Sequence, residues 1–274
     1  MTALPFRQVD VFSDEPFRGN PVAVVHDADG LTEEQMQAFA AWTNLSETTF
    51  LLTPTVPGAD YRVRIFTPAD ELPFAGHPTL GTAHAWLEAG GVPRGGDVVQ
   101  ECEVGLVTVR RGATLSFAAP PLLRSGPASE EERRAVLRAL RLEEKDVLGV
   151  EWVDNGPGWI AVRLRDAQAV LDVRPDASLM DGWFIGLVGA HPHGHECAVE
   201  VRGVFGGIED PVTGSLNASV AQWLIGAGEL PDRYVAAQGT VLGRRGRVLV
   251  ERVGDQVWIG GATVTRIRGH VSPS

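Results

Sequence analysis

Lysine is nearly missing from this chain. Among its 274 residues the single lysine is Lys145, which stands in the charged stretch 141–146. A lysine that forms a Schiff base has to lie in a site that depresses its pKa, and a charged surface stretch does not provide one. No glycine-rich dinucleotide loop follows a predicted strand either. The sequence therefore disfavours pyridoxal phosphate and predicts no cofactor.

Cysteine is scarce too. Cys102 and Cys197 are far apart and do not form a metal-binding or redox spacing. Each lies in an apolar alternating segment, which is typical of a buried free thiol. We expect both to be reduced, in a reducing compartment.

Long apolar runs and basic patches are absent as well. No run of 18 apolar residues occurs, and the N-terminus does not show a charged-then-apolar signal pattern. The net charge is −11, without a basic stripe to offset it. Nucleic acids and anionic membranes attract Lys/Arg patches, so we expect neither as a partner. The sequence predicts a cytoplasmic protein.

What the chain does contain is an internal duplication. Glu209 lies 138 positions after Glu71, and a series of further residues repeats at the same offset without a gap. The repeated pairs are Val63-Arg64 with Val201-Arg202, Pro73 with Pro211, Gly76 with Gly214, Ala83 with Ala221 and Pro93 with Pro231. We interpret this as two homologous halves, each with a strand, a loop and a small-residue helix. The Pro-rich segment 119–127 separates them, so the predicted domains are residues 1–125 and 126–274.

The loop 207–218 runs into the helix of the second half. Apolar residues recur after it at helical spacing, which predicts a helix N-terminus at Gly214-Ser215. Free N–H groups and the positive dipole end suit a carboxylate there. The alternative is that Thr213 or Ser215 merely caps the helix. Gly76-His77 is the equivalent start in the first half, and if the halves face one another the two starts converge on one cleft.

Other segments have recognisable local signals. Capping boxes begin helices at Thr32 and Ser129, and Asp176 is predicted to cap a helix to about Val188. Asn20 lies in a turn between two predicted strands, where it either reaches a cleft or serves the backbone. The segment 191–195 holds three histidines at alternate positions, but proline and glycine interrupt it, so we predict no metal site.

Several motifs together resemble the phenazine biosynthesis isomerase-like (PhzF-like) family. They are FSDEPFRGNPVAVV at 12–25, LSETTF at 45–50, FTPADELPFAGHPTLG at 66–81 and EDPVTGS at 209–215, with further glycines at 239, 243 and 246. The resemblance implies an α+β, diaminopimelate epimerase-like fold of two pseudo-symmetric halves, each a curved mixed β-sheet around a central helix. It also implies a cofactor-free isomerase and a homodimer.

The resemblance places Glu47 at the position that the family uses as general acid/base. From the residues alone, a Glu at a strand end such as Glu47 is usually a solvated edge residue. A catalytic Glu needs an apolar surround that raises its pKa, and Phe50, Phe66 and Phe74 are the candidates to supply one. His77 is expected to be neutral because it lies at a positive helix end.

The expected reaction is an isomerisation of a small carboxylic acid by a single carboxylate. Related epimerases use a thiol at each helix N-terminus, but here those positions hold Ala75 and Thr213. Glu47 would move a proton between two carbons, while Asp210 and His77 orient the substrate or shuttle a proton. The predicted ligand-binding groups are the following: Gly76, Gly214, Ser215, Asn20 and Thr213.

Two alternatives remain open from the sequence. One is a carboxylate-based epimerase or racemase, with Asp210 as the second acid facing Glu47. The other is a non-catalytic binding protein on the same fold. The family often has Ala-His where this chain has Leu216-Asn217, which leaves the substrate open.

Overall fold

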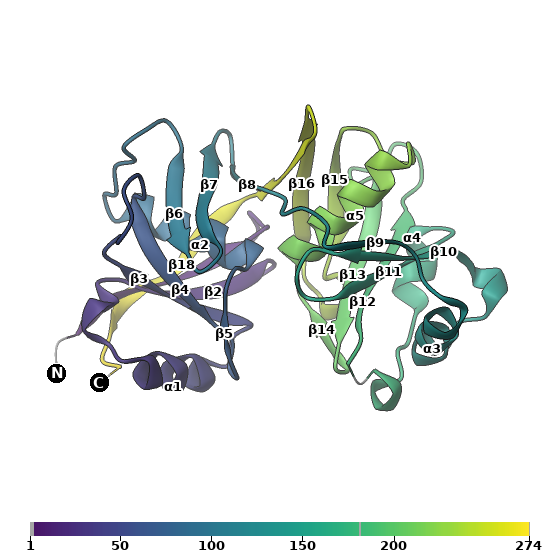
Figure 1. Ribbon diagram of the computed structural model, residues 1–274, viewed down its shortest axis with the longest axis horizontal. Helices are drawn as coiled ribbons and strands as arrows, with labels where there is room; N and C mark the ends of the chain where they lie inside the picture. The colour runs from purple at the N-terminus through teal and green to yellow at the C-terminus, as the bar shows by residue number, and fades with distance from the viewer. Residues whose placement is uncertain (1–2, 181, 274) are drawn as a thin grey trace. The chain divides into compact units, whose positions relative to one another are not determined.

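The computed structural model describes residues 3–180 and 182–273. The chain forms two compact units: Met1–Ala118 with Gly260–Ser274, and Ala119–Ile259 (Figure 1). The boundary predicted from the sequence lies instead between 125 and 126, which would put the C-terminal strand in the second half. That strand belongs to the first unit because it pairs antiparallel with the first strand, from Leu4 opposite Val271 to Val11 opposite Thr263.

The first unit is a mixed sheet around one buried helix. Its strand order is β18-β1-β2-β3-β4-β6-β7-β8, with β2–β3 and β4–β6 parallel and β5 paired to the end of β4. Its elements are β1 (Leu4–Val11), β2 (Asn20–Val25), η1 (Ala28–Gly30), α1 (Glu33–Thr43), β3 (Glu47–Leu52), β4 (Tyr61–Phe66), β5 (Glu71–Leu72), α2 (Gly76–Glu88), β6 (Val98–Cys102), β7 (Gly105–Arg111), β8 (Leu115–Ala118) and β18 (Thr263–Val271).

The second unit repeats this sequence of pairings. Its order is β9-β10-β11-β12-β13-β15-β16, with β11–β12 and β13–β15 parallel and β14 paired to the end of β13. Its elements are β9 (Arg124–Pro127), α3 (Glu130–Leu140), η2 (Glu144–Asp146), β10 (Val147–Asp154), β11 (Trp159–Leu164), α4 (Ala167–Asp172), η3 (Ala177–Leu179), β12 (Phe184–Ala190), β13 (Val199–Phe205), β14 (Ile208–Asp210), α5 (Gly214–Gly226), β15 (Arg233–Gln238), η4 (Thr240–Leu242), β16 (Gly246–Val253) and all but the last two residues of β17 (Gln256–Gly261).

The two central helices are the clearest expression of the duplication. Both the first and the last residue of α5 lie 138 positions after those of α2. Helix α2 contacts β1, β2, β3, β6, β7, β8 and β18, so the sheet curves around it. Such close packing depends on small residues: a Cβ on Gly81 would lie 2.3 Å from Cγ1 of Val22 on β2. The small-residue helices recognised in the sequence are therefore the buried centres of the two units.

The local start signals are confirmed for two helices and wrong for a third. Thr32 and Ser129 both form complete capping boxes, at the starts of α1 and α3. Asp176 caps only the short η3, and the chain then extends into β12. Strand β12 is flanked by β11 and β13 and buried on both faces, so its apolar residues form a continuous run. Such a run does not distinguish a buried strand from a buried helix.

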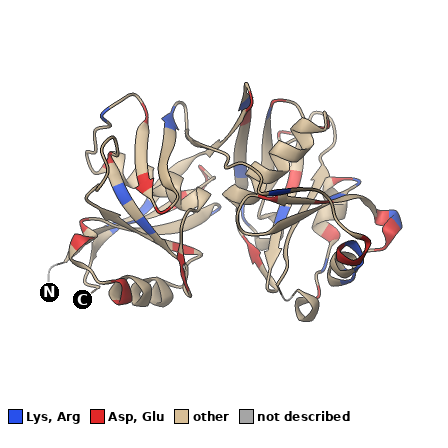
Figure 2. Cartoon of the chain, viewed as in Figure 1, with Lys and Arg blue, Asp and Glu red and all other residues tan. Residues whose placement is uncertain are grey.

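Ion pairs also follow the duplication. Arg64 binds Glu71 in the first unit, and Arg202 binds Glu209 in the second. Figure 2 shows acidic and basic residues interspersed along strands, helices and loops of both units. No helix in the described part of the chain combines the length and apolarity needed to span a lipid bilayer.

Candidate functional site

In the first unit, three predicted site residues come together at the ends of two strands and a helix. Asn20 begins β2, Glu47 begins the parallel strand β3, and His77 is the second residue of α2. The turn before Asn20 is held by Asp10, whose carboxylate accepts hydrogen bonds from the backbone N–H groups of Arg18 and Gly19. Local strand pairing and this turn thus bring the three side chains to one place.

His77 links the other two residues. Its Nε2 lies 3.3 Å from Oε2 of Glu47, and its Nδ1 lies 3.4 Å from Nδ2 of Asn20. Burial lowers the pKa of His77 from 6.5 to about 3, opposed by a backbone hydrogen bond with Pro21. The imidazole is therefore neutral at physiological pH, as expected, although burial rather than the helix dipole is the main cause. A neutral ring offers one N–H donor and one acceptor nitrogen.

The expected aromatic surround of Glu47 is wrong for Phe50 and Phe66. Side chains alternate along a strand, so Glu47 and Thr49 share one face of β3 while Phe50 lies on the other. Thr49 donates or accepts a hydrogen bond with Thr82 of α2, which identifies that face as the one toward the helix. Phe50 packs edge-to-face on Phe66 in the cluster beneath α1. Phe50 and Phe66 therefore belong to the opposite layer from Glu47.

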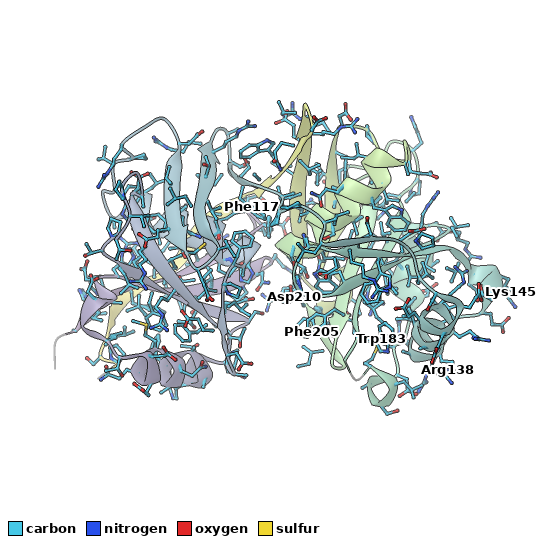
Figure 3. All side chains as sticks on the ribbon, in the orientation of Figure 1. Phe117, Arg138, Lys145, Trp183, Phe205 and Asp210 are labelled. Carbon is cyan, nitrogen blue, oxygen red and sulfur yellow. The ribbon has the colours of Figure 1, made fainter. Side chains whose placement is uncertain are left out.

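In the second unit, the loop before α5 is organised by Asp210 and Thr213. Asp210, labelled in Figure 3, ends β14 and accepts a 2.6 Å hydrogen bond from the Thr213 hydroxyl. Gln238 of β15 accepts from the backbone N–H of Thr213 and donates to its hydroxyl oxygen. Thr213 occupies the N-cap position of α5, yet its side chain makes no capping bond. Its hydroxyl holds Asp210 instead, so the interpretation of Thr213 as a simple cap is wrong.

Ser215 is held by two residues that lie outside the sequence motifs. Trp159 donates its indole N–H to Oγ of Ser215 at 3.0 Å. The Asn155 amide donates to the Ser215 carbonyl, also at 3.0 Å. Ser215 lies next to Gly214, so a hydroxyl and the backbone of the first turn of α5 are adjacent.

Leu216-Asn217, where this chain differs from the family pattern, lies in the protein interior beneath the loop before α5. Leu216 is fully buried, and a Cβ on Gly186 would lie 2.3 Å from its Cδ1. Asn217 is 1% exposed, and its amide donates to Oε1 of Gln238 and to the carbonyl of Thr213. Both residues therefore support the loop from the protein interior.

The duplication itself contained the signal for Gln238. The residue 138 positions earlier is Gln100, which donates to the Thr79 hydroxyl of α2 and accepts from the Tyr61 hydroxyl. Both units thus use a buried glutamine on the strand after the central helix to hold the first turn of that helix.

The sequence profile of the phenazine biosynthesis-like protein family matches residues 9–269. The chain belongs to this family. It is 36% identical over 294 residues to antisense-enhancing sequence 1 of Schizosaccharomyces pombe, covering 98% of this chain and 99% of that protein. It is 34% identical over 268 residues to trans-2,3-dihydro-3-hydroxyanthranilate isomerase of Pseudomonas aeruginosa, covering 91% of each. Its relatives place this PhzF-like chain among the isomerases.

Solved structures confirm the α+β fold. A PhzF-family phenazine biosynthesis protein from Bacillus anthracis matches with a TM-score of 0.85 at 24% identity, covering 99% of this chain and 100% of the other. A probable proline racemase has the same fold. The racemase-like architecture expected from the sequence is therefore correct for this PhzF-like protein.

The thiols of the PhzF-like chain do not lie at its helix starts. Cys102 ends β6, and Cys197 precedes β13. Both are buried and free, as predicted. Burial raises the pKa of both thiols, that of Cys197 to about 11. A thiol acid/base pair at Ala75 and Thr213 is thus excluded by residue identity and by position.

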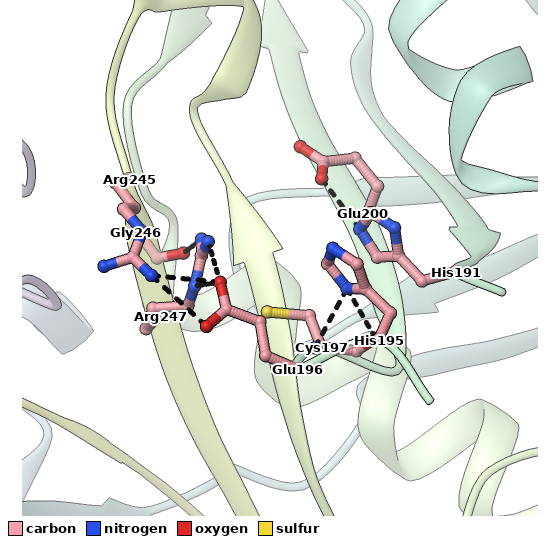
Figure 4. Close-up of polar contacts among 8 residues, drawn as sticks. All are labelled: His191, His195, Glu196, Cys197, Glu200, Arg245, Gly246 and Arg247. Carbon is pink, nitrogen blue, oxygen red and sulfur yellow. Dashed lines mark hydrogen bonds and ion pairs between the residues drawn. The ribbon is translucent and has the colours of Figure 1, made fainter. Parts of the chain in front are cut away.

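The histidines at 191–195 serve the loop in which they lie (Figure 4). His191 pairs with the buried Glu200 at 3.1 Å, and its ring stacks on that of His195 at 3.9 Å. His195 accepts a hydrogen bond from the backbone N–H of Cys197, while His193 is exposed. Within residues 3–180 and 182–273, no group of three or more His, Cys, Asp or Glu side chains is arranged to hold a metal ion.

Lys145, labelled in Figure 3, lies on η2 with 74% of its side chain exposed. It pairs with Glu143, which raises its pKa. This surface position agrees with the expectation from the sequence, and a Schiff base would require the opposite: a lysine that is buried and has a depressed pKa.

Proposed function

We propose that this chain is a cofactor-independent isomerase that moves a proton between two carbons of a small carboxylic acid. Glu47 is the acid/base group. The observation that supports this role is the contact between Glu47 Oε2 and Nε2 of a buried, neutral His77 at 3.3 Å. Both atoms are buried, so solvent does not separate the carboxylate from the ring.

The proposed reaction needs one carboxylate and no external oxidant or reductant. Glu47 removes a proton from a carbon next to a double bond, and the electron pair of the broken C–H bond forms a new C=C bond. The pair of the old double bond then takes the same proton back from Glu47 at the next-but-one carbon. In this proposal His77, which lies against the Glu47 carboxylate, orients it, and Asn20 lies against the other ring nitrogen of His77.

In the second unit we propose that the start of α5 binds the substrate carboxylate. The N–H groups of Gly214 and Ser215 and the Ser215 hydroxyl are the binding groups, and Asp210 orients a polar substituent of the substrate. The absence of a side-chain cap at α5 supports this role, because an uncapped helix start favours an anion. Gly76 is the equivalent position at the start of α2, whose N-cap Ala75 likewise makes no side-chain cap bond.

The first substrate to test is trans-2,3-dihydro-3-hydroxyanthranilate, the compound that appears in the name of the relative from Pseudomonas aeruginosa. It contains the carboxylate that the proposal requires. A homodimer is also proposed on the family resemblance, and a cytoplasmic location on the sequence features given above. Light scattering of the purified protein tests the oligomeric state.

The substitution Glu47→Gln tests the acid/base role. It preserves the shape of the side chain and removes the base, so turnover should fall by about a hundred-fold to ten-thousand-fold. In deuterated water the wild type should incorporate deuterium at the carbon that receives the proton, and the variant should not. Glu33→Gln, the same chemical change at an exposed position on α1, is the matched control and should keep the wild-type rate.

Two results would contradict the assignment. Near-full turnover by Glu47→Gln, combined with loss of turnover in Asp210→Asn, would make Asp210 the base. Deuterium incorporation with inversion at one carbon, without movement of the double bond, would identify an epimerase instead.

A further inference from the structure

Trp159 is a buried residue that neither the sequence motifs nor the proposed reaction accounts for. It begins β11, is 2% exposed, and donates its indole N–H to Oγ of Ser215. Its ring packs edge-to-face on Phe184, with centroids 5.6 Å apart and planes at 90°. A Cβ on Gly203 would lie 3.4 Å from its Cη2. These contacts bury the ring, and the hydrogen bond to Ser215 Oγ defines where its N–H points.

The first unit has a corresponding arrangement. Ser215 lies 138 positions after His77, and each is the second residue of its central helix. Asn20, the first residue of β2, places its amide nitrogen 3.4 Å from Nδ1 of His77. Trp159, the first residue of β11, places its indole nitrogen 3.0 Å from Ser215 Oγ. In both units the first residue of the strand thus places a side-chain nitrogen beside the second residue of the central helix, and in the second unit this contact is a hydrogen bond donated by the strand residue.

The chemistry of indole determines whether the Ser215 hydroxyl acts as donor or acceptor in this bond. An indole N–H donates and never accepts, so the Ser215 oxygen must be the acceptor in this bond. The hydroxyl proton of Ser215 is then directed elsewhere, and within the described residues no group accepts it. The Ser215 carbonyl is occupied separately, by the Asn155 amide and by the Ser219 hydroxyl. The backbone and the oxygen of Ser215 are therefore both held, while its O–H remains available as a donor.

We propose that Trp159 is a positioning residue that commits the Ser215 hydroxyl to donate to the substrate carboxylate. This role rests on the proposed carboxylate site at the start of α5. Trp159 itself does not contact the substrate; it acts through Ser215. Donation from Trp159 also polarises the hydroxyl, because hydrogen bonds in a chain strengthen one another.

Binding of 3-hydroxyanthranilate tests this role without requiring turnover. This stable aromatic acid carries the same carboxylate, amino and hydroxyl groups as trans-2,3-dihydro-3-hydroxyanthranilate. Its Kd is measured by calorimetry for wild type, Trp159→Phe, Ser215→Ala and the double variant. Each single variant should bind about twofold to tenfold more weakly, the usual worth of one hydrogen bond. The double variant should match Ser215→Ala, because Trp159 acts only through that hydroxyl.

Phe184→Leu is the matched control, since it disturbs the packing of the indole and retains its N–H. Its Kd should stay within about twofold of wild type. The indole N–H signal of Trp159, identified as the one absent from Trp159→Phe in ¹⁵N spectra, should shift when ligand is added to wild type. In Ser215→Ala that shift should be lost.

The proposal is overturned if Trp159→Phe binds as wild type does, if its effect adds fully to that of Ser215→Ala, or if Phe184→Leu weakens binding equally. Unchanged binding by Ser215→Ala would instead remove Ser215 from the proposed carboxylate site, and with it the role of Trp159. Absence of binding by the wild type would reject both. A failure of Glu47 as the base leaves these binding results unaffected, so the two failures are distinguishable.

Discussion

The salt bridges Arg64–Glu71 and Arg202–Glu209 are equivalent in the two units, but they differ in burial. The same Glu→Gln substitution can therefore be compared in two environments. In the second unit, the Arg202 side chain is 3% exposed and that of Glu209 is 10% exposed. Arg202 donates to both carboxylate oxygens of Glu209 and also to the carbonyls of Val170 and Val173. Glu209→Gln keeps the side-chain shape but leaves a buried guanidinium without a counter-charge.

Breaking a buried ion pair from one side costs about 3–5 kcal/mol, because the remaining charge is neither hydrated nor paired. This is a large share of the roughly 5–15 kcal/mol that stabilises a typical domain. The equivalent change Glu71→Gln should cost about 1 kcal/mol or less. Arg64 and Glu71 are 20% and 28% exposed, and Glu33 supplies a second carboxylate at 2.8 Å from Arg64.

Thermal unfolding followed by circular dichroism measures the difference. At about 2–4 °C per kcal/mol for a chain of this size class, Glu209→Gln should lower Tm by roughly 10 °C and Glu71→Gln by a few degrees at most. Urea titration gives the corresponding free energies of unfolding. Equal shifts for the two variants, or a shift within about 1 kcal/mol for Glu209→Gln, would refute the argument from burial.

Two further predictions concern a histidine and a glycine. Because burial lowers the folded-state pKa of His77 to about 3, the unfolded chain binds a proton more readily below pH 6.5. The free energy of unfolding should therefore fall by about 2 kcal/mol as the pH is lowered from 6.5 to 4.5. Urea titrations at several pH values measure this dependence, and His77→Gln should make it weaker. An unchanged pH dependence in the variant would contradict the burial of a neutral ring. Gly81→Ala places a methyl 2.3 Å from Cγ1 of Val22 and should lower the free energy of unfolding by about 1–3 kcal/mol. Adding Val22→Ala to the same chain should restore part of this loss. If it restores none, the strain does not arise from the contact with Val22.

Several features were predictable from the sequence because the forces behind them are local. The capping boxes at Thr32 and Ser129 satisfy helix N–H groups within three residues, so the motif and the structure coincide. The starts of α2 and α5 follow from the repeated loops before Gly76 and Gly214. The 138-residue offset indicated equal helices, and the two helices have equal length. The same offset applied to Gln238 also indicates its counterpart Gln100.

Other features depend on where distant segments meet, and only the tertiary structure decided them. The C-terminal strand joins the first unit because β18 pairs with β1 across almost the whole chain length. Phe50 lies away from Glu47 because a strand sends alternate side chains to opposite faces, and helix α2 covers only one of them. Trp159 reaches Ser215 across 56 residues, a contact that neither local propensity nor spacing encodes. Local chemistry therefore determined where the helices begin, whereas sheet pairing and side-chain packing determined which groups their first turns present.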